Sequence, residues 1–456
     1  MNAAIIKNEA ISLLCDGLQD NNYINVSDYT KYAVKRGLRN ADGTGVMAGL
    51  TKICSVEGYY IDDGEKVPKE GHLFYRGYDI NDIVSGCQAE NRFGFEEVIW
   101  ILLFGSLPTA DQLERFNTYL AEMRELPDNF TEDMIMKAPS PNIMNKIARG
   151  VLALYSYDDN PDDTSIENVL NQSLRLIAQL PSIMAYAYQV KRRHYYHKSM
   201  YLHPTKASHH TAEGILNSIR SDKTFTDAEA KLLDICLMLH AEHGGGNNST
   251  FATRVLSSSG TDTYAAIAAG IGALKGPKHG GANHKVAEML DSFREGCPDI
   301  TDEGYVADHL RKIMRKEAGD GSGLVYGMGH AVYTLSDPRA VILKEKAKEF
   351  AMGTEFENEF RLLEHIENLT PALFTGVTGK SKTMCANVDL YSGLVYKMLR
   401  IPEDLYTPLF ATARMAGWCA HRIEELYTCN RIIRPAYKSL SSHSEYISLD
   451  KRDKNT

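Results

Sequence analysis

The stretch FEEVIWILLFGSLPTADQLERFNTYLAEM, residues 95–123, predicts two consecutive helices and the turn between them. An apolar run from Phe95 to Phe104 stops at Gly105, and glycine commonly ends a helix because it adopts the left-handed conformation without strain. Thr109, with Gln112 three residues later, is the signature of a capping box at the start of the next helix.

Similar periodic runs recur along the chain. They lie near 143–156, 165–188, 209–220, 226–240, 263–274, 284–294, 305–318, 340–352, 356–368, 389–399 and 408–427. Strand patterns are few, and the clearest is TKICSVEGYYIDDGEKV followed by HLFYRGYDI, where Asp63-Gly64 predicts the turn of a small hairpin. The sequence therefore predicts an all-α fold with a minor β-hairpin near the N-terminus.

Length and composition limit the class of protein. A chain of 456 residues exceeds one ordinary core, so two domains are expected. A hydrophobic content of 43% and a charged content of 24% are typical of a soluble globular protein. The net charge of −9 argues against a nucleic-acid partner, and an anionic substrate would need cations gathered locally in a cleft.

The cysteines and the N-terminus favour the cytoplasm. The eight cysteines contain no CxxC pair and suggest neither a disulfide framework nor a zinc site. Residues 1–20 lack the features of a secretory signal and read as helix, and no apolar run reaches the ~18 residues of a membrane span. We therefore expect a cytoplasmic protein with no membrane partner.

Three histidines lie beside glycines. In LHAEHGGGNNSTF, His243 precedes a triple glycine that would let the chain fold over a small anion with the amides of Asn247 and Asn248 free to donate; a helix-capping histidine is the plainer alternative. A metal site formed by His240, Glu242 and His243 is disfavoured because the order is not HExxH.

The second histidine, His279, lies in GALKGPKHGGANHK, between a Gly-Pro step and a Gly-Gly pair. If it lies at the N-terminus of the next helix, the helix dipole lowers its pKa and leaves a neutral imidazole that can donate to a developing oxyanion. A surface histidine in a glycine-rich turn is the alternative. The third, His330 in GMGHAVYTLSDPRA, repeats the arrangement.

Charged residues complete the set of candidates. Asp389 precedes an apolar helix in NVDLYSG, where an aspartate is most often an N-cap. Arg339 follows His330 by nine residues, and Arg414 and Arg434 could each be ordinary surface ion pairs. Taken together, three histidines on glycine hinges, one carboxylate and three arginines favour a site for an anionic substrate.

These motifs, in this order and spacing, resemble the citrate synthase family of Si stereospecificity over residues 40–437. The resemblance implies an all-α homodimer whose large helical domain, 1–279 and 395–456, and smaller helical domain, 280–394, close over an interdomain cleft. It implies condensation of acetyl-CoA with oxaloacetate to citrate, with acetyl-CoA as co-substrate and no permanently bound cofactor or metal.

Roles for individual residues also follow from the resemblance. Asp389 would remove a methyl proton from acetyl-CoA, His279 would stabilise the enol, and His330 would polarise the ketone of oxaloacetate. The implied oxaloacetate ligands are His243, Arg339 and Arg414, with a backbone contact from Asn247 and with Arg434 reaching into the partner's site.

The coenzyme A contacts are the least direct part of the resemblance. They would be Leu324, Val325, Gly327, Gly329, Lys380 and Asn387. Thr334 stands where many family members have a basic residue, so Lys380 would share the phosphate contacts. The helical N-terminus favours a dimer without inhibition by NADH.

Three alternatives compete with this interpretation. A 2-methylcitrate synthase would use the same residues with propionyl-CoA, and one methylene changes binding by only ~1–3 kcal/mol. The others are a metal-dependent hydrolase built on His240, Glu242 and His243, and a helical binding protein without activity.

Overall fold

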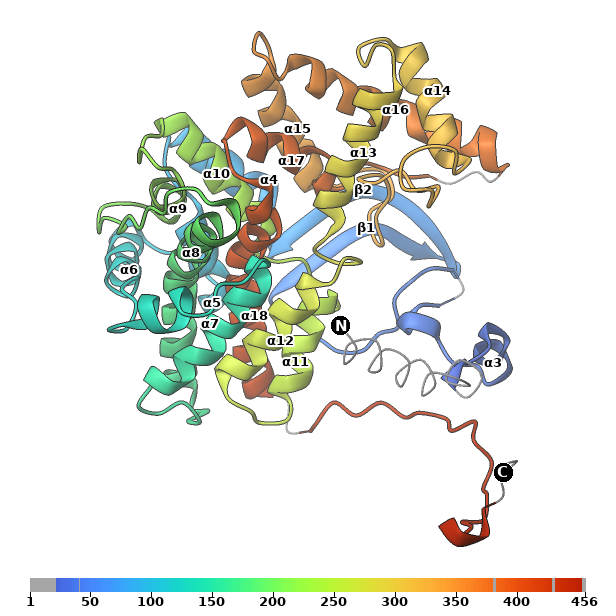
Figure 1. Cartoon of the computed structure of the whole chain (residues 1–456), viewed down its shortest axis with the longest axis horizontal. Helices are drawn as coiled ribbons and strands as arrows, with labels where there is room; N and C mark the ends of the chain where they lie inside the picture. The colour runs from blue at the N-terminus through green and yellow to red at the C-terminus, as the bar shows by residue number, and fades with distance from the viewer. Residues whose placement is uncertain (1–21, 41, 380–382, 429–430, 453–456) are drawn as a thin grey trace, which may run out of the picture.

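The computed structural model describes residues 22–40, 42–379, 383–428 and 431–452. Among them the chain is mostly helical, which confirms the all-α prediction (Figure 1). The N-terminal half contains α3 (Val26–Lys31), α4 (Ile80–Ala89), α5 (Phe95–Phe104), α6 (Ala110–Glu122), α7 (Ile143–Leu154), α8 (Ile166–Tyr196) and α9 (Thr211–Ile219). The C-terminal half contains α10 (Asp227–His240), α11 (Asn248–Ser257), α12 (Thr263–Lys275), α13 (Ala282–Gly296), α14 (Glu303–Met314), α15 (Pro338–Ala351), α16 (Glu357–Thr378), α17 (Val388–Met398) and α18 (Tyr406–Thr428).

The predicted hairpin is present. Strands β1 (Cys54–Asp62) and β2 (Glu65–Tyr75) pair antiparallel, and the short β3 (Tyr78–Asp79) extends the sheet in the order β1-β2-β3. Asp63 and Gly64 have φ values of 44° and 83°. Two consecutive residues in this left-handed region form the tight turn that suits the twist of a hairpin.

The helix pair predicted from residues 95–123 is also confirmed. α5 ends at Gly105, whose φ of 81° is left-handed, and the Gly105 amide donates to the carbonyl of Ile101. The Gln112 amide donates to the Thr109 hydroxyl oxygen at 3.3 Å, and the Thr109 amide donates to the Gln112 side chain at 2.8 Å. This reciprocal pair is the predicted capping box.

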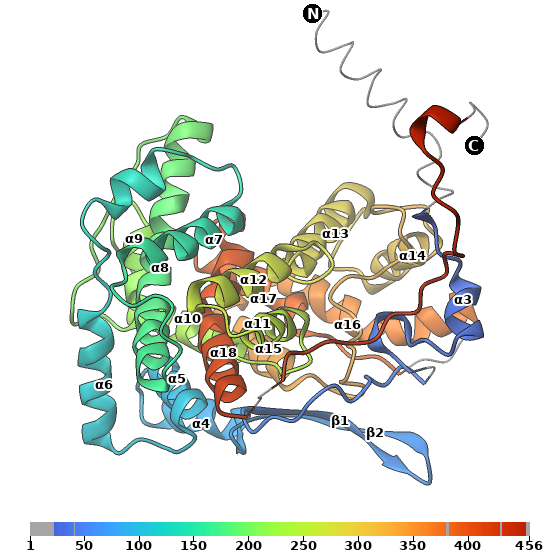
Figure 2. The ribbon, with the colours of Figure 1, turned by 90° about the horizontal axis from the view of Figure 1, so that it is seen from below.

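α18 is the central helix of the larger group of helices. It packs against α5, α8, α10, α11 and α12, and its Trp418 is fully buried (Figures 1 and 2). The helices α13 to α17 form a second group with contacts among themselves. The domain limits 1–279, 280–394 and 395–456 stay a prediction.

Three helices escaped the sequence analysis, namely α3, α4 and α11. α11 begins directly after the triple glycine, at a run of polar residues that shows no apolar periodicity. The helical N-terminus predicted for residues 1–20 lies outside the described residues. Within the described ranges, no helix combines the length and apolar character needed to cross a lipid bilayer.

Candidate active site

His279, His330 and Asp389 line one pocket. It has a volume of about 140 Å³ and lies where α13 and α17 of the second helix group face α18. Its lining consists of His243, Asn247, His279, Gly280, Asn283, His330, Arg339, Asn387, Val388, Asp389, Tyr396, Tyr406, Thr407, Phe410 and Arg414. Seven candidates predicted from the sequence as catalytic or oxaloacetate-binding residues therefore converge from five separate motifs.

His279 lies in the turn between α12 and α13. The turn needs Gly280, because a Cβ there would lie 2.3 Å from the carbonyl oxygen of Leu274. Burial, followed by the positive charge of Arg414, lowers the pKa of His279 to about 4. The imidazole is thus neutral as predicted, but the cause differs: α13 begins only at Ala282, and burial rather than the helix dipole dominates.

Ser249, in the first turn of α11, contacts the His279 ring. Its Oγ lies 3.1 Å from His279 Nε2, accepts from Trp418 Nε1 at 3.2 Å, and lies 3.0 Å from Asn247 Oδ1. An indole nitrogen can only donate, so Ser249 has a single proton for the two remaining neighbours. When Ser249 donates to Asn247 Oδ1, His279 carries its proton on Nε2 and donates to Ser249; when Ser249 donates to His279 Nε2, the neutral ring carries its proton on Nδ1.

His330 is held by backbone. Its Nδ1 accepts from the amides of Val332 at 3.0 Å and Tyr333 at 3.1 Å. Burial, followed by the charge of Arg339, lowers the pKa of His330 to about 4. A neutral ring whose Nδ1 accepts carries its proton on Nε2, so His330 is a fixed Nε2–H donor.

His243 lies beside His330, three residues after the end of α10. The two rings meet edge to face at 5.1 Å, and His243 Nε2 lies 3.3 Å from the Tyr333 hydroxyl. Burial and then Arg339 hold the pKa of His243 well below its ordinary value. His243 is therefore a neutral polar group among the cations of the pocket.

Arg339 is paired within its own motif. Its Nε and Nη2 donate to the two carboxylate oxygens of Asp337 at 3.0 and 2.8 Å. Burial opposes the charge of Arg339, but Asp337 outweighs it and holds the pKa of the guanidinium above its ordinary value. Asp337 also caps α15, so the Asp-Pro-Arg sequence both starts this helix and orients its arginine.

Arg414 is the cation available to an anion. It is fully buried on α18, and its Nε donates to the carbonyl of His240 at 2.7 Å. Its Nη1 and Nη2 are buried without a hydrogen-bond partner in the described residues. Buried donors are nearly always paired, so these two nitrogens point to a missing anionic partner such as a carboxylate.

Asp389 lies in the first turn of α17. The N-cap of this helix is Asn387, whose Oδ1 accepts from the Asp389 amide at 3.0 Å, so Asp389 is not the cap. Burial raises the pKa of Asp389 to about 6, although the positive charge of Arg339 opposes the shift. A carboxylate with a raised pKa that is still ionised near neutrality suits a general base.

Backbone pairing joins the His330 loop to the start of α17. The Asn387 amide donates to the Gly327 carbonyl at 2.9 Å, and the Gly329 amide donates to the Cys385 carbonyl at 2.7 Å. Gly327 is needed here: its φ is +82°, and a Cβ would approach Leu390 to 2.8 Å. These bonds set the distance between His330 and Asp389.

Some predicted residues lie away from this pocket. Arg434 is exposed on the extended C-terminal segment seen in Figure 2. Leu324 is 58% exposed, and neither it nor Val325 lines the pocket. Lys380 lies outside the described residues. The hydroxyl of Thr334 donates to the Gly58 carbonyl of β1 at 2.7 Å.

The prediction of free amides after the triple glycine is wrong for Asn247, whereas for Asn248 it stays a prediction. The Asn247 amide donates to the Gly244 carbonyl at 3.0 Å, because Asn247 is the N-cap of α11. Asn248 is the first residue of that helix. Asn247 still lines the pocket, and Oδ1 of its side chain lies beside Ser249.

The sequence analysis missed Ser249, Trp418, Tyr333 and Asp337. The N-capping pattern Asn-x-Ser after the glycines was a usable signal for α11 and hence for Ser249. No sequence signal pairs Ser249 with Trp418, since 169 positions separate them.

Glu242 turns away from both neighbouring histidines. Its Oε1 lies 3.0 Å from His421 Nε2 on α18, and both side chains are fully buried. Among the described residues, no three His, Cys, Asp or Glu side chains lie together as a metal site would require.

Comparison with known proteins identifies the protein family. A family model described as "Citrate synthase, C-terminal domain" matches residues 40–436. The chain belongs to the citrate synthase family. It is an enzyme of a family whose fold is all-α, as the predicted resemblance implied.

Individual relatives divide between two activities. A citrate synthase of Haloferax volcanii is 33% identical over 408 residues, which cover 88% of this chain and 94% of the relative. A 2-methylcitrate synthase of Shewanella oneidensis is 32% identical over 381 residues, covering 83% and 90%. The crystal structure of citrate synthase from Thermotoga maritima has 28% identity and a TM-score of 0.70, covering 90% of this chain and 98% of that one.

Proposed function

We propose that the protein condenses acetyl-CoA with oxaloacetate and water to give citrate and coenzyme A. The observation that carries this proposal is the convergence of Asp389, His279 and His330 around two unpaired nitrogens of Arg414. A base, two neutral donors and a buried cation are the groups that a carbon–carbon condensation with a keto diacid requires.

The first step is removal of a methyl proton from acetyl-CoA by Asp389. A thioester α-proton is only weakly acidic, so the carbonyl oxygen must be stabilised as the proton leaves. His279, with its proton on Nδ1, donates to that oxygen. Because its pKa of about 4 keeps the ring neutral near pH 7, His279 acts as an uncharged hydrogen-bond donor.

The second step forms the carbon–carbon bond. The enol carbon attacks the ketone carbon of oxaloacetate, and the electron pair of the C=O bond moves to oxygen. The fixed Nε2–H of His330 donates to this oxygen as charge develops. The alkoxide oxygen then takes up one proton, which balances the one that Asp389 removed, and citryl-CoA results. Water attacks the thioester carbon of citryl-CoA; the C–S bond breaks, and coenzyme A leaves as the thiol with one proton from that water.

The carboxylates of oxaloacetate would meet the two arginines. Nη1 and Nη2 of Arg414 form a fork for one carboxylate, and His243 and the free N–H groups of Arg339 face the other. Closure of the predicted small domain, 280–394, would exclude water until condensation is complete. Among the predicted coenzyme A contacts, Asn387 lines the pocket, and it is hydrogen-bonded to the carbonyls of Gly327 and Gly329 in the His330 loop.

The proposal includes a cytoplasmic homodimer. Arg434 is exposed and far along the chain from its own pocket, which suits a role in the partner's site. The experiment is complementation: an Arg434→Ala chain mixed with a Asp389→Asn chain regains activity only if each site uses both chains. Sedimentation of the wild type as a monomer would refute this part.

The second candidate is 2-methylcitrate synthase, because relatives with that name match at nearly the same identity. Thiol release, measured with acetyl-CoA and with propionyl-CoA in the presence of oxaloacetate, tests both candidates. We expect a higher kcat/KM for acetyl-CoA. A roughly tenfold preference for propionyl-CoA would select the second candidate, since one methylene is worth about that much.

The same assay tests the two remaining alternatives. Release that depends on oxaloacetate and persists after chelation excludes a metal-dependent hydrolase. Absence of release with either thioester would favour the binding protein without activity.

A further inference from the structure

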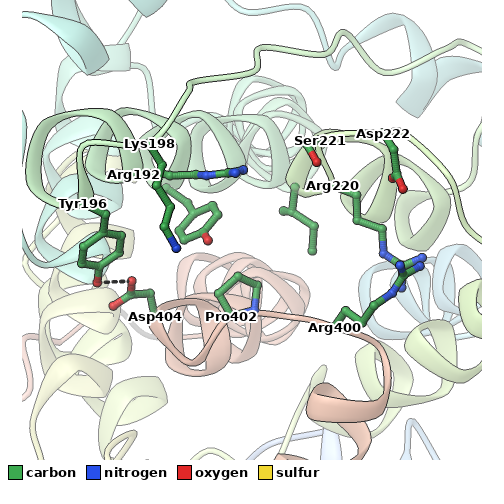
Figure 3. Close-up of a pocket in the computed structure, with 11 residues that line it drawn as sticks. Arg192, Tyr196, Lys198, Arg220, Ser221, Asp222, Arg400, Pro402 and Asp404 are labelled. Atoms are coloured by element: carbon green, nitrogen blue, oxygen red, sulfur yellow. Dashed lines mark hydrogen bonds between the residues drawn. The ribbon is translucent and has the colours of Figure 1, made fainter.

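A second pocket is lined in part by the connection between α17 and α18. It has a volume of about 360 Å³, within the range of small-molecule sites, and shares no lining residue with the pocket of Asp389. The end of α8, the segment after α9 and residues 400–404 enclose it (Figure 3).

Two of its cations have no ion-pair partner among the described residues. Arg192 and Lys198 project from the end of α8 on one side of the pocket, and Arg400 and Pro402 lie across from them (Figure 3). Arg192 stacks on Tyr201 with its guanidinium carbon 5.4 Å from the ring centre. Stacking fixes the guanidinium while leaving its N–H groups able to donate.

The carboxylates of the pocket already have donors. Asp404 accepts from Lys191 Nζ and from the Tyr196 hydroxyl, each at 2.6 Å. Asp222 accepts from the Thr224 amide at 3.0 Å. The charge of Asp404 is thus balanced by Lys191, whereas Asp222 keeps its negative charge; the pocket lining still has four cationic side chains against two carboxylates.

On the far side, two guanidinium groups share one carboxylate. Nη2 of Arg220 is 2.7 Å from Glu229 Oε1, and Nη2 of Arg400 is 3.6 Å from the same oxygen. Arg220 is 93% buried, since only 7% of it is exposed, and its Nε has no partner among the described side chains. The pocket consequently carries an excess of positive charge in a protein whose net charge is −9.

We propose that this pocket binds a small phosphorylated molecule through its phosphoryl group. The donors come from three chain segments that surround the space, and a tetrahedral phosphoryl group presents oxygens in several directions, whereas a carboxylate presents two in one plane. Arginine forks and a lysine ammonium are the side chains that recognise phosphate most often.

A ligand in this pocket would contact the link between the two helices that carry Asp389 and Arg414. Residues 399–405 join α17, which carries Asp389, to α18, which carries Arg414. Arg220 Nη2 already donates to the Leu399 carbonyl at 2.6 Å. A phosphoryl group between Arg192, Lys198 and Arg400 would tie this link to α8 as well, and so restrain it.

Inorganic pyrophosphate is the probe, titrated by calorimetry into wild type, an Arg192→Gln/Lys198→Gln variant and an Arg193→Gln/Lys206→Gln control. The control loses the same charge from exposed positions outside the pocket. We expect wild type and control to bind alike and the pocket variant to bind roughly tenfold or more weakly, because two charge-assisted contacts are lost. Circular dichroism verifies that all three are folded.

Hydrogen exchange locates the ligand. Pyrophosphate should slow amide exchange in 219–222 and 399–404 of the wild type and leave the pocket variant unchanged. Equal binding by wild type and pocket variant, or no binding to wild type at millimolar pyrophosphate, would overturn the proposal. Because the two pockets share no lining residue, this result is independent of the proposed condensation.

Discussion

The two halves of the active-site pocket hold their histidines by different means. On the half formed by α11, the α12–α13 turn and α18, His279 depends on the hydroxyl of Ser249. On the half formed by the 327–339 segment and α17, His330 is fixed by two backbone amides.

The difference determines which proton each ring can donate. A hydroxyl rotates and can send its proton to either of two neighbours, so the tautomer of His279 depends on a side-chain network. A backbone amide can only donate, so the tautomer of His330 is set by the fold. Substitutions should therefore alter the first half through its network, whereas the second half can be altered only through the reacting residues themselves.

The largest effect should come from Asp389→Asn, which removes the proposed base. We expect kcat to fall about a thousandfold, since general base catalysis is worth 10²–10⁴. Thiol release measures the loss, and calorimetry with oxaloacetate should show unchanged binding. A loss of less than tenfold would mean that another group removes the proton.

The same variant should be more stable at pH 7. Burial raises the folded-state pKa of Asp389 to about 6 from an ordinary value of 3.8, so stability falls as pH rises between these values and stays reduced above them. Asparagine removes this cost of roughly 1–3 kcal/mol. Urea unfolding at pH 7 and below pH 4 checks the sign: the difference should vanish at the lower pH.

The next effect compares the two histidines directly. His279→Gln and His330→Gln each remove a donor to a developing negative oxygen, and we expect kcat/KM to fall by roughly 10²–10³ in both. The two roles can be distinguished by omitting oxaloacetate. With acetyl-CoA alone, exchange of the methyl protons should be lost in His279→Gln and retained in His330→Gln. The opposite pattern would reverse the two roles.

Ser249→Ala should have a smaller effect, confined to the first half. We expect a loss of roughly thirtyfold in kcat, or about 2 kcal/mol, because His279 Nε2 loses its hydrogen-bond partner and a buried indole donor loses its acceptor. Trp418→Phe is the matched control, since it removes one neighbour of Ser249 and leaves the serine proton for His279. An equal loss in both variants would indicate a packing role instead.

The smallest effect is the pH dependence. Asp389 must be ionised to act as a base, so kcat/KM should fall roughly tenfold at pH 5, one unit below a pKa of about 6. The histidines, with pKa values of about 4, should be neutral throughout this range. Steady-state rates between pH 4.5 and 8 measure this fall in kcat/KM on the acidic side of the profile. An activity that rises toward pH 5 would instead require a protonated histidine.

Much of the fold could be predicted because its signals are local. The capping box of Thr109 and Gln112 and the turn at Asp63-Gly64 each depend on a few adjacent residues. α11 was missed because its first turn is polar and follows three glycines, so packing against α12 and α18, not periodicity, stabilises it.

The candidate site could be predicted only in part. Glycine hinges, arginines and the family resemblance identified seven residues that do line the pocket. Three findings depend on neighbours far along the chain: the contact of His279 with Ser249, the position of Arg414 beside the His240 carbonyl, and the burial of Asp389.

The sequence by itself determined where helices begin and end, and which kinds of side chain could serve a keto diacid and a thioester. The tertiary structure alone decided which nitrogen of His330 carries the proton, which arginine keeps unpaired donors, and why a carboxylate has a raised pKa. The physical reason is that caps and turns are set by bonds between near neighbours, whereas desolvation and proton positions are set by every group that the fold packs around a side chain.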